Sequence, residues 1–299
     1  MPVPGRRFAA EAALVGAAFL FGSTFVLVQH AVEDVTPMAY LAARFTVGTL
    51  ALAPFAWVVI RRSPGYPTRE LVTCGAIAGL LLFGGYAFQT VGLQYTSASN
   101  SAFITGLYVP ITPILEAVIR RQRPATPVIV GIGIATVGLF LLTGANLSLR
   151  RGDVLMLGCA VMFAAWLVYQ NRFITRLRAV PFTTVQMAVL TLVALPATRI
   201  TGVGEVTALA VFAILFTGVA CSAVALSLQL YGQQQLGPSR TALILLLEPV
   251  FAGIVGFAAG DRLGAVGVLG ALVILVGIGI SELVPARSGV RETVDRLSG

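Results

Sequence analysis

Charged residues are scarce in this chain, and lysine is absent altogether. Charged side chains make up 11% of the 299 residues and hydrophobic ones 57%, and the mean hydropathy is +0.92. A soluble domain carries about 25% charged residues. The apolar runs also recur too often for one buried core to use them all. This composition excludes an ordinary soluble protein and indicates a membrane protein whose first partner is the lipid bilayer.

Residues that bind metals or carry redox chemistry are also few. Cys74, Cys159 and Cys221 lie far apart inside apolar stretches, and His30 is the single histidine. Their spacing fits neither a disulfide framework nor a metal site. Nucleotide-binding and hydrolase motifs are missing as well. We therefore expect no metal, no cofactor and no catalytic residue, which argues against an enzyme.

Positive charge is present only as arginine, and its position is informative. The net charge is +8 and the isoelectric point is about 10.1, values that could suggest nucleic-acid binding. However, nearly all the arginines sit in short connectors or tails beside apolar runs, as topology signals do. We therefore expect no nucleic-acid partner. Most arginines fall on the side of the two termini, so the positive-inside rule predicts that both termini are cytoplasmic.

Ten apolar stretches are long enough to cross a bilayer, which needs roughly 20 residues per helix. The first is too long for a signal peptide and lacks a cleavage site, so it is predicted to be the first span. The predicted spans are 8–29, 37–60, 70–94, 98–119, 125–145, 152–171, 181–199, 206–230, 238–259 and 263–284. We therefore predict an all-α polytopic membrane protein with ten transmembrane helices.

The second half of the chain repeats the first. A constant offset of 139 positions aligns Pro110, Arg123, Gly131 and Gly138 with Pro249, Arg262, Gly270 and Gly277, and an offset of 142 aligns Phe21 with Phe163 and Pro54 with Pro196. One repeat thus contains five helices. Because five is odd, the two repeats enter the membrane from opposite sides, and inverted repeats place a substrate site between them. The predicted units are a first repeat at 8–145, a second at 152–284 and a cytoplasmic tail at 285–299.

Polar side chains form a stripe inside the fourth span. Ser101, Thr105, Tyr108 and Thr112 recur at helical spacing, so they share one face, which will avoid lipid. Further polar and aromatic residues in the third, sixth and eighth spans are Tyr86, Gln89, Thr90, Trp166, Tyr169, Gln170, Gln229, Tyr231, Gln233, Gln234 and Gln235. Serine and threonine often bond only their own helix. The glutamines and tyrosines, however, favour a central cavity for a small organic molecule.

Two ionisable residues lie at depth. Glu248 is about ten residues into the ninth span, or roughly 15 Å, near the bilayer centre. It is a candidate proton carrier or partner for a substrate cation, and the alternative is a protonated or arginine-paired structural carboxyl. Arg44, in the second span, either contacts an anionic group or ties helices together.

Prolines interrupt equivalent spans. Pro110 and Pro113 lie in the fourth span and Pro249 in the ninth. Each removes one backbone hydrogen bond and clashes with the carbonyl four residues earlier, so we predict kinks. These kinks either act as hinges during transport or shape the cavity.

Several ordered motifs resemble the drug/metabolite transporter superfamily, specifically its ten-helix EamA-type members, over about residues 8–284. They are Phe21-Gly22-Ser23-Thr24-Phe25-Val26, Ala43-Arg44-Phe45, Tyr95-Thr96-Ser97-Ala98, Glu248-Pro249-Val250-Phe251 and Gly260-Asp261-Arg262-Leu263. The chain departs from the family in helix 1, where tryptophan is common, and at Asp261, where glutamate is common. The departures bear on the subgroup, and the nearest subgroup is the YddG-like exporters of aromatic and other amino acids.

The resemblance implies export of a small metabolite through a cavity lined by helices 1–4 and 6–9. We expect an inner-membrane exporter of amino acids that works by alternating access between inverted repeats. The alternative is proton-coupled efflux of drugs or quaternary amines, with Glu248 as the cation partner. The oligomeric state does not follow from the sequence, and a monomer is compatible with it. The expected substrate-binding residues are Ser23, Thr24, Tyr86, Gln89, Tyr108, Trp166, Gln229 and Glu248.

Overall fold

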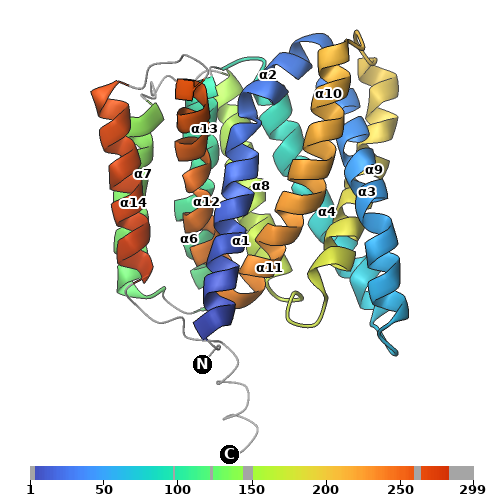
Figure 1. The fold of residues 1–299 in the computed structure, drawn as a ribbon, viewed down its shortest axis with the longest axis horizontal. Helices are drawn as coiled ribbons and strands as arrows, with labels where there is room; N and C mark the ends of the chain where they lie inside the picture. The colour runs from blue at the N-terminus through green and yellow to red at the C-terminus, as the bar shows by residue number, and fades with distance from the viewer. Residues whose placement is uncertain (1–3, 97, 122–123, 144–150, 259–263, 283–299) are drawn as a thin grey trace, which may run out of the picture.

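The chain folds into a bundle of helices (Figure 1). The computed structural model describes residues 4–96, 98–121, 124–143, 151–258 and 264–282. Within these residues the only β-pairing is an isolated bridge between Val35 and Gly204. In chain order the helices are α1 Pro4–Ser23, α2 Phe25–Asp34, α3 Pro37–Arg61, α4 Thr68–Gly92, α5 Ala98–Gly106, α6 Tyr108–Arg120, α7 Thr126–Thr143, α8 Arg151–Gln170, α9 Ala179–Thr201, α10 Ala208–Thr217, the π-helix η1 Gly218–Ala225, α11 Leu226–Leu236, α12 Pro238–Leu245, α13 Leu247–Ala258 and α14 Ala265–Glu282.

These helices group into the ten expected spans. Six continuous or gently bent helices are long and apolar enough to cross a membrane by themselves, and α1 with α2 forms a seventh as a pair bent by 44°. Three shorter apolar segments, 103–119, 126–142 and 265–280, complete the set. The predicted fold class of an all-α polytopic protein with two five-helix repeats is therefore confirmed.

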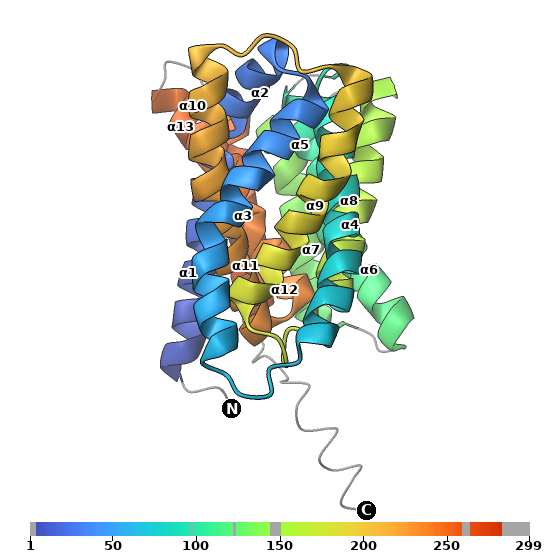
Figure 2. The same ribbon diagram turned by 90° about the vertical axis from the view of Figure 1, so that its right-hand side faces the viewer.

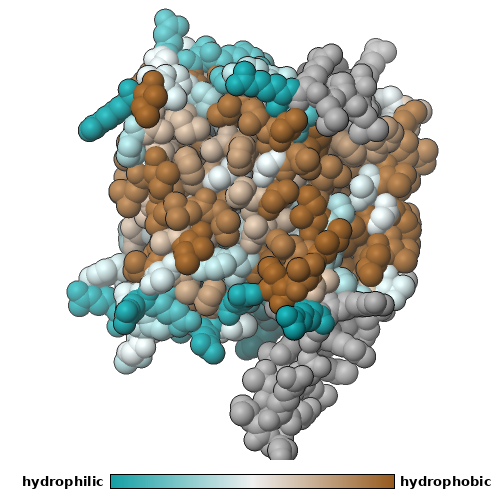
Figure 3. Space-filling view, turned by 180° about the vertical axis from the view of Figure 1, so that it is seen from behind, coloured by the Kyte–Doolittle hydropathy of each residue, from teal (hydrophilic) through white to brown (hydrophobic). Residues whose placement is uncertain are grey.

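The outer surface matches a bilayer. On the face seen in Figure 3, a wide hydrophobic band crosses the middle of the molecule between two hydrophilic ends. Large apolar side chains on this surface are exposed to the surroundings, among them Phe55, Leu192 and Phe212. At one border the Arg61 guanidinium lies 5.0 Å from the centre of the Trp57 ring, as expected of a cation and an aromatic ring anchored at the membrane interface.

Glycine contacts between α7 and α14 demonstrate that the repeats are inverted. A Cβ added to Gly138 would lie 2.8 Å from the Gly270 carbonyl oxygen, and one added to Gly277 would lie 2.6 Å from the Gly131 carbonyl oxygen. The numbering rises along α7 while it falls along α14, so the two helices are antiparallel. Because α7 and α14 are equivalent helices of the two repeats, their opposite directions require a two-fold axis in the membrane plane.

The other helix contacts obey the same symmetry. The third span of the first repeat, α4, packs on α8 and α9, which are the first two spans of the second repeat. The third span of the second repeat packs in the same way on the first two spans of the first repeat: η1 and α11 contact α1, and η1 contacts α3. The pair α3 and α9 lies on the right-hand side of the bundle in Figure 1 and the pair α7 and α14 on the left-hand side. Figure 2 shows the side formed by α3 and α9 from the front. Helix α1 begins at the bottom of Figure 1. We call this the lower end of the bundle and the opposite one the upper end.

Four local features differ from, or lie beyond, the sequence prediction. The first predicted span is divided at Thr24, and the eighth ends at Leu236 rather than 230 because its glutamine-rich end is still helical. The eighth span also contains the π-helix η1, eight residues long. The predicted tail 285–299 and the motif at 260–263 lie outside the described residues.

The fourth and ninth spans are interrupted at equivalent points. The breaks fall at Leu107 and Leu246, each three residues before a proline at Pro110 or Pro249. Proline offers no N–H to the carbonyl four residues earlier, so the Gly106 and Leu245 carbonyls lose that partner. Helix α6, in contrast, continues through Pro113.

The connectors of the two repeats are joined at the upper end. Thr36 N donates to the Val203 carbonyl at 3.0 Å, and Glu205 N donates to the Asp34 carbonyl at 2.9 Å. Gly204, between these partners, has φ +82°, and a Cβ there would overlap the Asp34 carbonyl oxygen. Glycine is therefore required at this position.

Candidate functional site

The described residues enclose a cavity between the two repeats. Its space, including the part open to the solvent, measures about 830 Å³. Both repeats contribute to the walls, as the predicted inverted architecture requires. The lining residues are Phe21, Thr24, Val28, Arg44, Tyr86, Gln89, Thr90, Leu93, Thr105, Tyr108, Phe163, Trp166, Leu167, Leu226, Gln229, Leu245 and Glu248.

Seven of the eight predicted binding residues line this cavity, and Ser23 does not. The Ser23 hydroxyl instead donates to the Leu20 carbonyl at 3.1 Å. Thr24 does line the cavity, although its hydroxyl is also occupied by the Leu20 and Phe21 carbonyls, at 3.1 and 3.0 Å. Such bonding back to the preceding turn bends helices, which accounts for the break between α1 and α2.

Aromatic rings form one continuous wall. The Phe163 ring lies at its centre, with ring-centroid distances of 5.2 Å to Tyr86 and 6.4 Å to both Tyr108 and Trp166. The Trp166 indole N–H donates to Gln186 Oε1 at 2.5 Å, so its polar group is satisfied by α9. The rings therefore offer apolar faces to a ligand without leaving this N–H unpaired.

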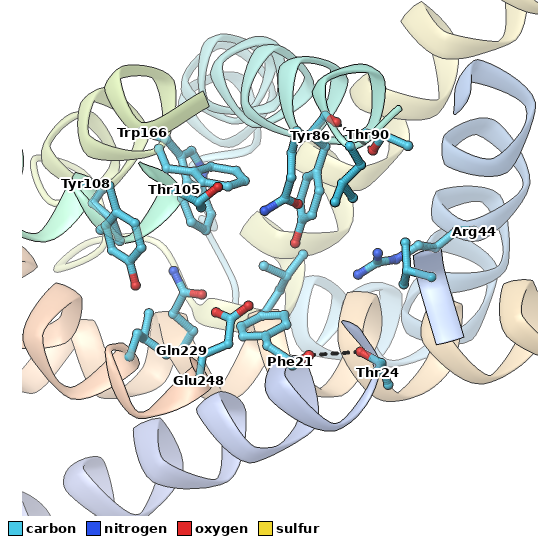
Figure 4. A pocket seen from close by; sticks show the side chains of 17 residues that line it. Phe21, Thr24, Arg44, Tyr86, Thr90, Thr105, Tyr108, Trp166, Gln229 and Glu248 are labelled. Carbon is cyan, nitrogen blue, oxygen red and sulfur yellow. Dashed lines mark hydrogen bonds between the residues drawn. The ribbon is translucent and has the colours of Figure 1, made fainter. Parts of the chain in front are cut away.

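Neutral polar groups of the lining divide into occupied and open ones. Thr90 donates to the Tyr86 carbonyl at 2.7 Å, so its hydroxyl is occupied within its own helix. The amides of Gln89 and Gln229 form no side-chain hydrogen bond with any other described residue. Gln229 is 3% exposed, and its amide points into the cavity (Figure 4). Because a buried amide needs partners, Gln229 is ready to bind a polar ligand group, and the half-buried Gln89 offers a second open amide to the same cavity.

Two ionisable side chains, one basic and one acidic, enter the cavity from different walls (Figure 4). Arg44 comes from α3, where its Nε donates to Ser222 Oγ at 2.9 Å and its guanidinium lies over the rings of Phe45 and Tyr86, 5.3 and 5.2 Å from their centres. Glu248 comes from the first turn of α13. Among the described residues neither side chain has a salt-bridge partner, and they do not form one with each other.

The lining of the cavity includes half-buried residues toward the upper end and only buried ones toward the lower end. At the upper end Val28 and Gln89 are half-buried, whereas Leu167, at the lower end of the cavity, is 1% exposed. Below the cavity, Gln170 Nε2 donates to Gln233 Oε1 and Gln233 Nε2 donates to the Leu167 carbonyl, both at 2.6 Å. This buried amide pair seals the lower end.

Other predicted polar residues have structural roles. Ser101 donates to Met156 Sδ at 3.1 Å, Thr112 to the Tyr108 carbonyl, and Gln234 to the Ile174 and Leu177 carbonyls. None of them lines the cavity. No cluster of metal-ligating side chains occurs among the residues with described positions.

Several lining residues were not selected from the sequence as binding residues. Phe163 and Phe21 are the main examples. The repeat alignment pairs these two residues, and it could have identified them as lining residues because a residue at the interface of inverted repeats recurs in both copies. Arg44 was recognised from the sequence as an ionisable residue at depth. Its guanidinium is held beside the cavity by contacts with Tyr86 and Ser222, which belong to other helices and could not be predicted from the sequence.

Comparison with known proteins gives a consistent result. The model of the EamA-like transporter family matches residues 9–144 and 150–282. An uncharacterized transporter of Archaeoglobus fulgidus is 30% identical over 280 residues, which cover 93% of this chain and 87% of the relative. The uncharacterized inner membrane transporter YedA of Escherichia coli K12 is 26% identical over 308 residues, covering 98% and 99%.

A solved crystal structure shares the fold. Its TM-score is 0.73 at 18% sequence identity, with 91% of this chain and 96% of that chain covered.

Proposed function

The chain belongs to the EamA-like transporter family and is thus a multi-pass membrane transporter rather than an enzyme. From this we propose that it exports amino acids. Aromatic and other neutral amino acids are the expected substrates, as for YddG-like exporters. The transport cycle would alternate access between the inverted repeats around the central cavity.

One observation carries this proposal, namely the mixed chemistry of the cavity. An amino acid has a charged, hydrogen-bonding backbone and a separate side chain. The cavity has open amides at Gln89 and Gln229, charges at Arg44 and Glu248, and an aromatic wall around Phe163. A bare ion filter would use rings of carbonyls or like charges instead.

The asymmetry of the cavity supports alternating access. A transporter of this kind closes one end while the other is open, and the lower end is closed by Gln170 and Gln233. Export would require this amide pair to separate while the upper end closes. The amide oxygen Gln170 Oε1 is buried and has no hydrogen-bond partner among the described residues, so hydration on opening would compensate for the bonds that break.

The expected location is the inner membrane with both termini cytoplasmic. Exposed arginines such as Arg62, Arg69, Arg172 and Arg176 lie at the lower end beside the start of α1. Under the positive-inside rule the lower end is cytoplasmic, and the cavity then opens to the outside.

Flux measurements test the proposal. Proteoliposomes containing the purified protein should take up radiolabelled phenylalanine, and Phe163→Ala should weaken uptake about 10-fold because an aromatic contact of one to two kcal/mol is lost. The control Phe55→Ala alters a side chain that is 64% exposed on the outer surface and should transport normally. Absence of flux for every neutral amino acid would refute the proposal.

Efflux of organic cations is the second candidate, favoured by the unpaired carboxyl of Glu248 beside aromatic rings. Aromatic walls and a carboxylate are also what cations bind. The variant Glu248→Gln distinguishes the two functions. Drug/proton antiport should be abolished in it, whereas zwitterion flux should persist at a reduced rate because Arg44 and the glutamines remain.

A further inference from the structure

Arg44 is a buried cation that forms no salt bridge with any described carboxylate. Its side chain is 5% exposed, and the described carboxylates form no salt bridge with it. Uncompensated charge in the middle of a membrane protein is costly and marks functional positions. Yet Arg44 reaches the cavity, so an anionic group can reach it there.

The geometry around Arg44 fixes its guanidinium in one orientation. Ser222 Oγ accepts from Nε, the Tyr40 hydroxyl is a second hydrogen-bond neighbour, and the Tyr86 and Phe45 rings flank the group. With Nε occupied, the donors left for a ligand belong to the terminal nitrogens. Two parallel N–H groups at fixed positions match the two oxygens of a carboxylate.

The π-helix places Ser222 beside Arg44. Ser222 belongs to η1, which packs on α3, and the two segments approach closely because a Cβ on Gly48 would lie 2.9 Å from the Gly218 carbonyl oxygen and from Ser222 Cβ. A π-turn inserts an extra residue per turn and is frequent at functional sites. Here it directs a hydroxyl toward the guanidinium.

We propose that Arg44 binds the carboxylate of the substrate, that Ser222 is the positioning residue for its guanidinium, and that the cavity thereby selects amino acids over the corresponding amines. The proposal rests on the proposed function and specifies how the site distinguishes its substrates. Glu248, unpaired in another wall of the same cavity, receives the ammonium group, so the two charges of a zwitterion are recognised separately.

Three related ligands test this assignment by binding to the purified full-length protein. Phenylalanine carries both charges, phenethylamine lacks the carboxylate and 3-phenylpropionate lacks the ammonium. The wild type should bind phenylalanine more tightly than either. Arg44→Gln should weaken phenylalanine and 3-phenylpropionate about 10-fold to 100-fold, as loss of a charge-assisted pair does, and change phenethylamine less than about 3-fold.

Ser222→Ala should weaken phenylalanine by about 3-fold to 10-fold and leave phenethylamine unchanged, since the charge stays but its orientation is lost. This variant also tests the proposal if Arg44→Gln does not fold, with Arg44→Lys as a further variant that keeps the charge without the planar fork. Equal losses for phenylalanine and phenethylamine in these variants would reveal a purely structural role and overturn the proposal.

The outcomes separate the two levels of inference. If the wild type binds phenylalanine but the variants keep its preference over phenethylamine, only the role of Arg44 is wrong. If the wild type binds phenethylamine but not phenylalanine, the cation function replaces the proposed one, and the carboxylate role is overturned with it. If the wild type binds none of the three ligands, the role of Arg44 in binding the phenylalanine carboxylate is rejected, and flux of the other neutral amino acids decides whether the proposed function stands.

Discussion

The amide of Gln233 has two partners beneath the cavity, Gln170 and the Leu167 carbonyl. Replacing Gln233 by Leu removes both hydrogen bonds and leaves the partner groups buried. Each such bond in a membrane protein is worth roughly 0.6–2 kcal/mol. We therefore expect Gln233→Leu to lower the unfolding free energy by about 1–3 kcal/mol, measured by denaturation in detergent.

Gln235→Leu is the matched control, since this neighbour is only half-buried and forms no side-chain hydrogen bond with other described residues. Its stability should change little. Equal stability of the two variants would mean that the amide pair does not hold the lower end closed.

At the level of single residues, the sequence locates polar groups but not their partners. The polar side chains of Tyr86, Gln89 and Gln229 inside apolar spans predicted that they face away from lipid, and they line the cavity. It could not show that Gln233 is bonded to Gln170 while Gln229 is open, because that distinction depends on contacts between α8 and α11. Ser23 and Thr24 are adjacent in sequence, yet only Thr24 faces the cavity.

Helix α7 contains two glycines with different surroundings, which allows a controlled test of the α7–α14 contact. A Cβ on Gly138 would overlap the backbone of α14, whereas one on Gly133 would meet nothing within 4 Å. We expect Gly138→Leu to destabilise the protein by about 1–3 kcal/mol or more, through overpacking between helices. Thermal unfolding in detergent measures the change.

Gly133→Leu carries the same added side chain on the same helix and should unfold at nearly the wild-type temperature. Equal destabilisation by both variants would show that the effect is loss of glycine itself and not the close helix contact.

At the level of elements, hydropathy located most spans to within two residues at each end, but it ended the first span at 29 instead of Asp34 and the eighth at 230 instead of Leu236. The eighth was too short because Gln233, Gln234 and Gln235 are polar, although Gln233 is buried and the other two are half-buried. Proline predicted the breaks before Pro110 and Pro249. The break at Thr24 and the π-helix contain no proline, so proline could not predict them; the two meet where Cys221 Sγ of η1 lies 3.1 Å from Thr24 Oγ1.

For the whole molecule, the arginine distribution predicts which end faces the cytoplasm. Arg62→Cys places a thiol in the exposed lower connector, and Val206→Cys places one at the upper end, where Val206 is 63% exposed. The native cysteines are buried. In intact cells an impermeant maleimide should label only Val206→Cys, and both variants after permeabilisation. Labelling of Arg62→Cys alone would reverse the orientation.

The bridge between Val35 and Gly204 has a consequence for building hybrids. Each of these residues belongs to a different copy of the duplicated unit, yet their backbones are hydrogen-bonded neighbours. One repeat therefore cannot be exchanged independently of the other. A chimera that takes one repeat from a relative also needs a matching connector in the other repeat, including a glycine at position 204. Without it, the backbone hydrogen bonds between the two connectors will not form.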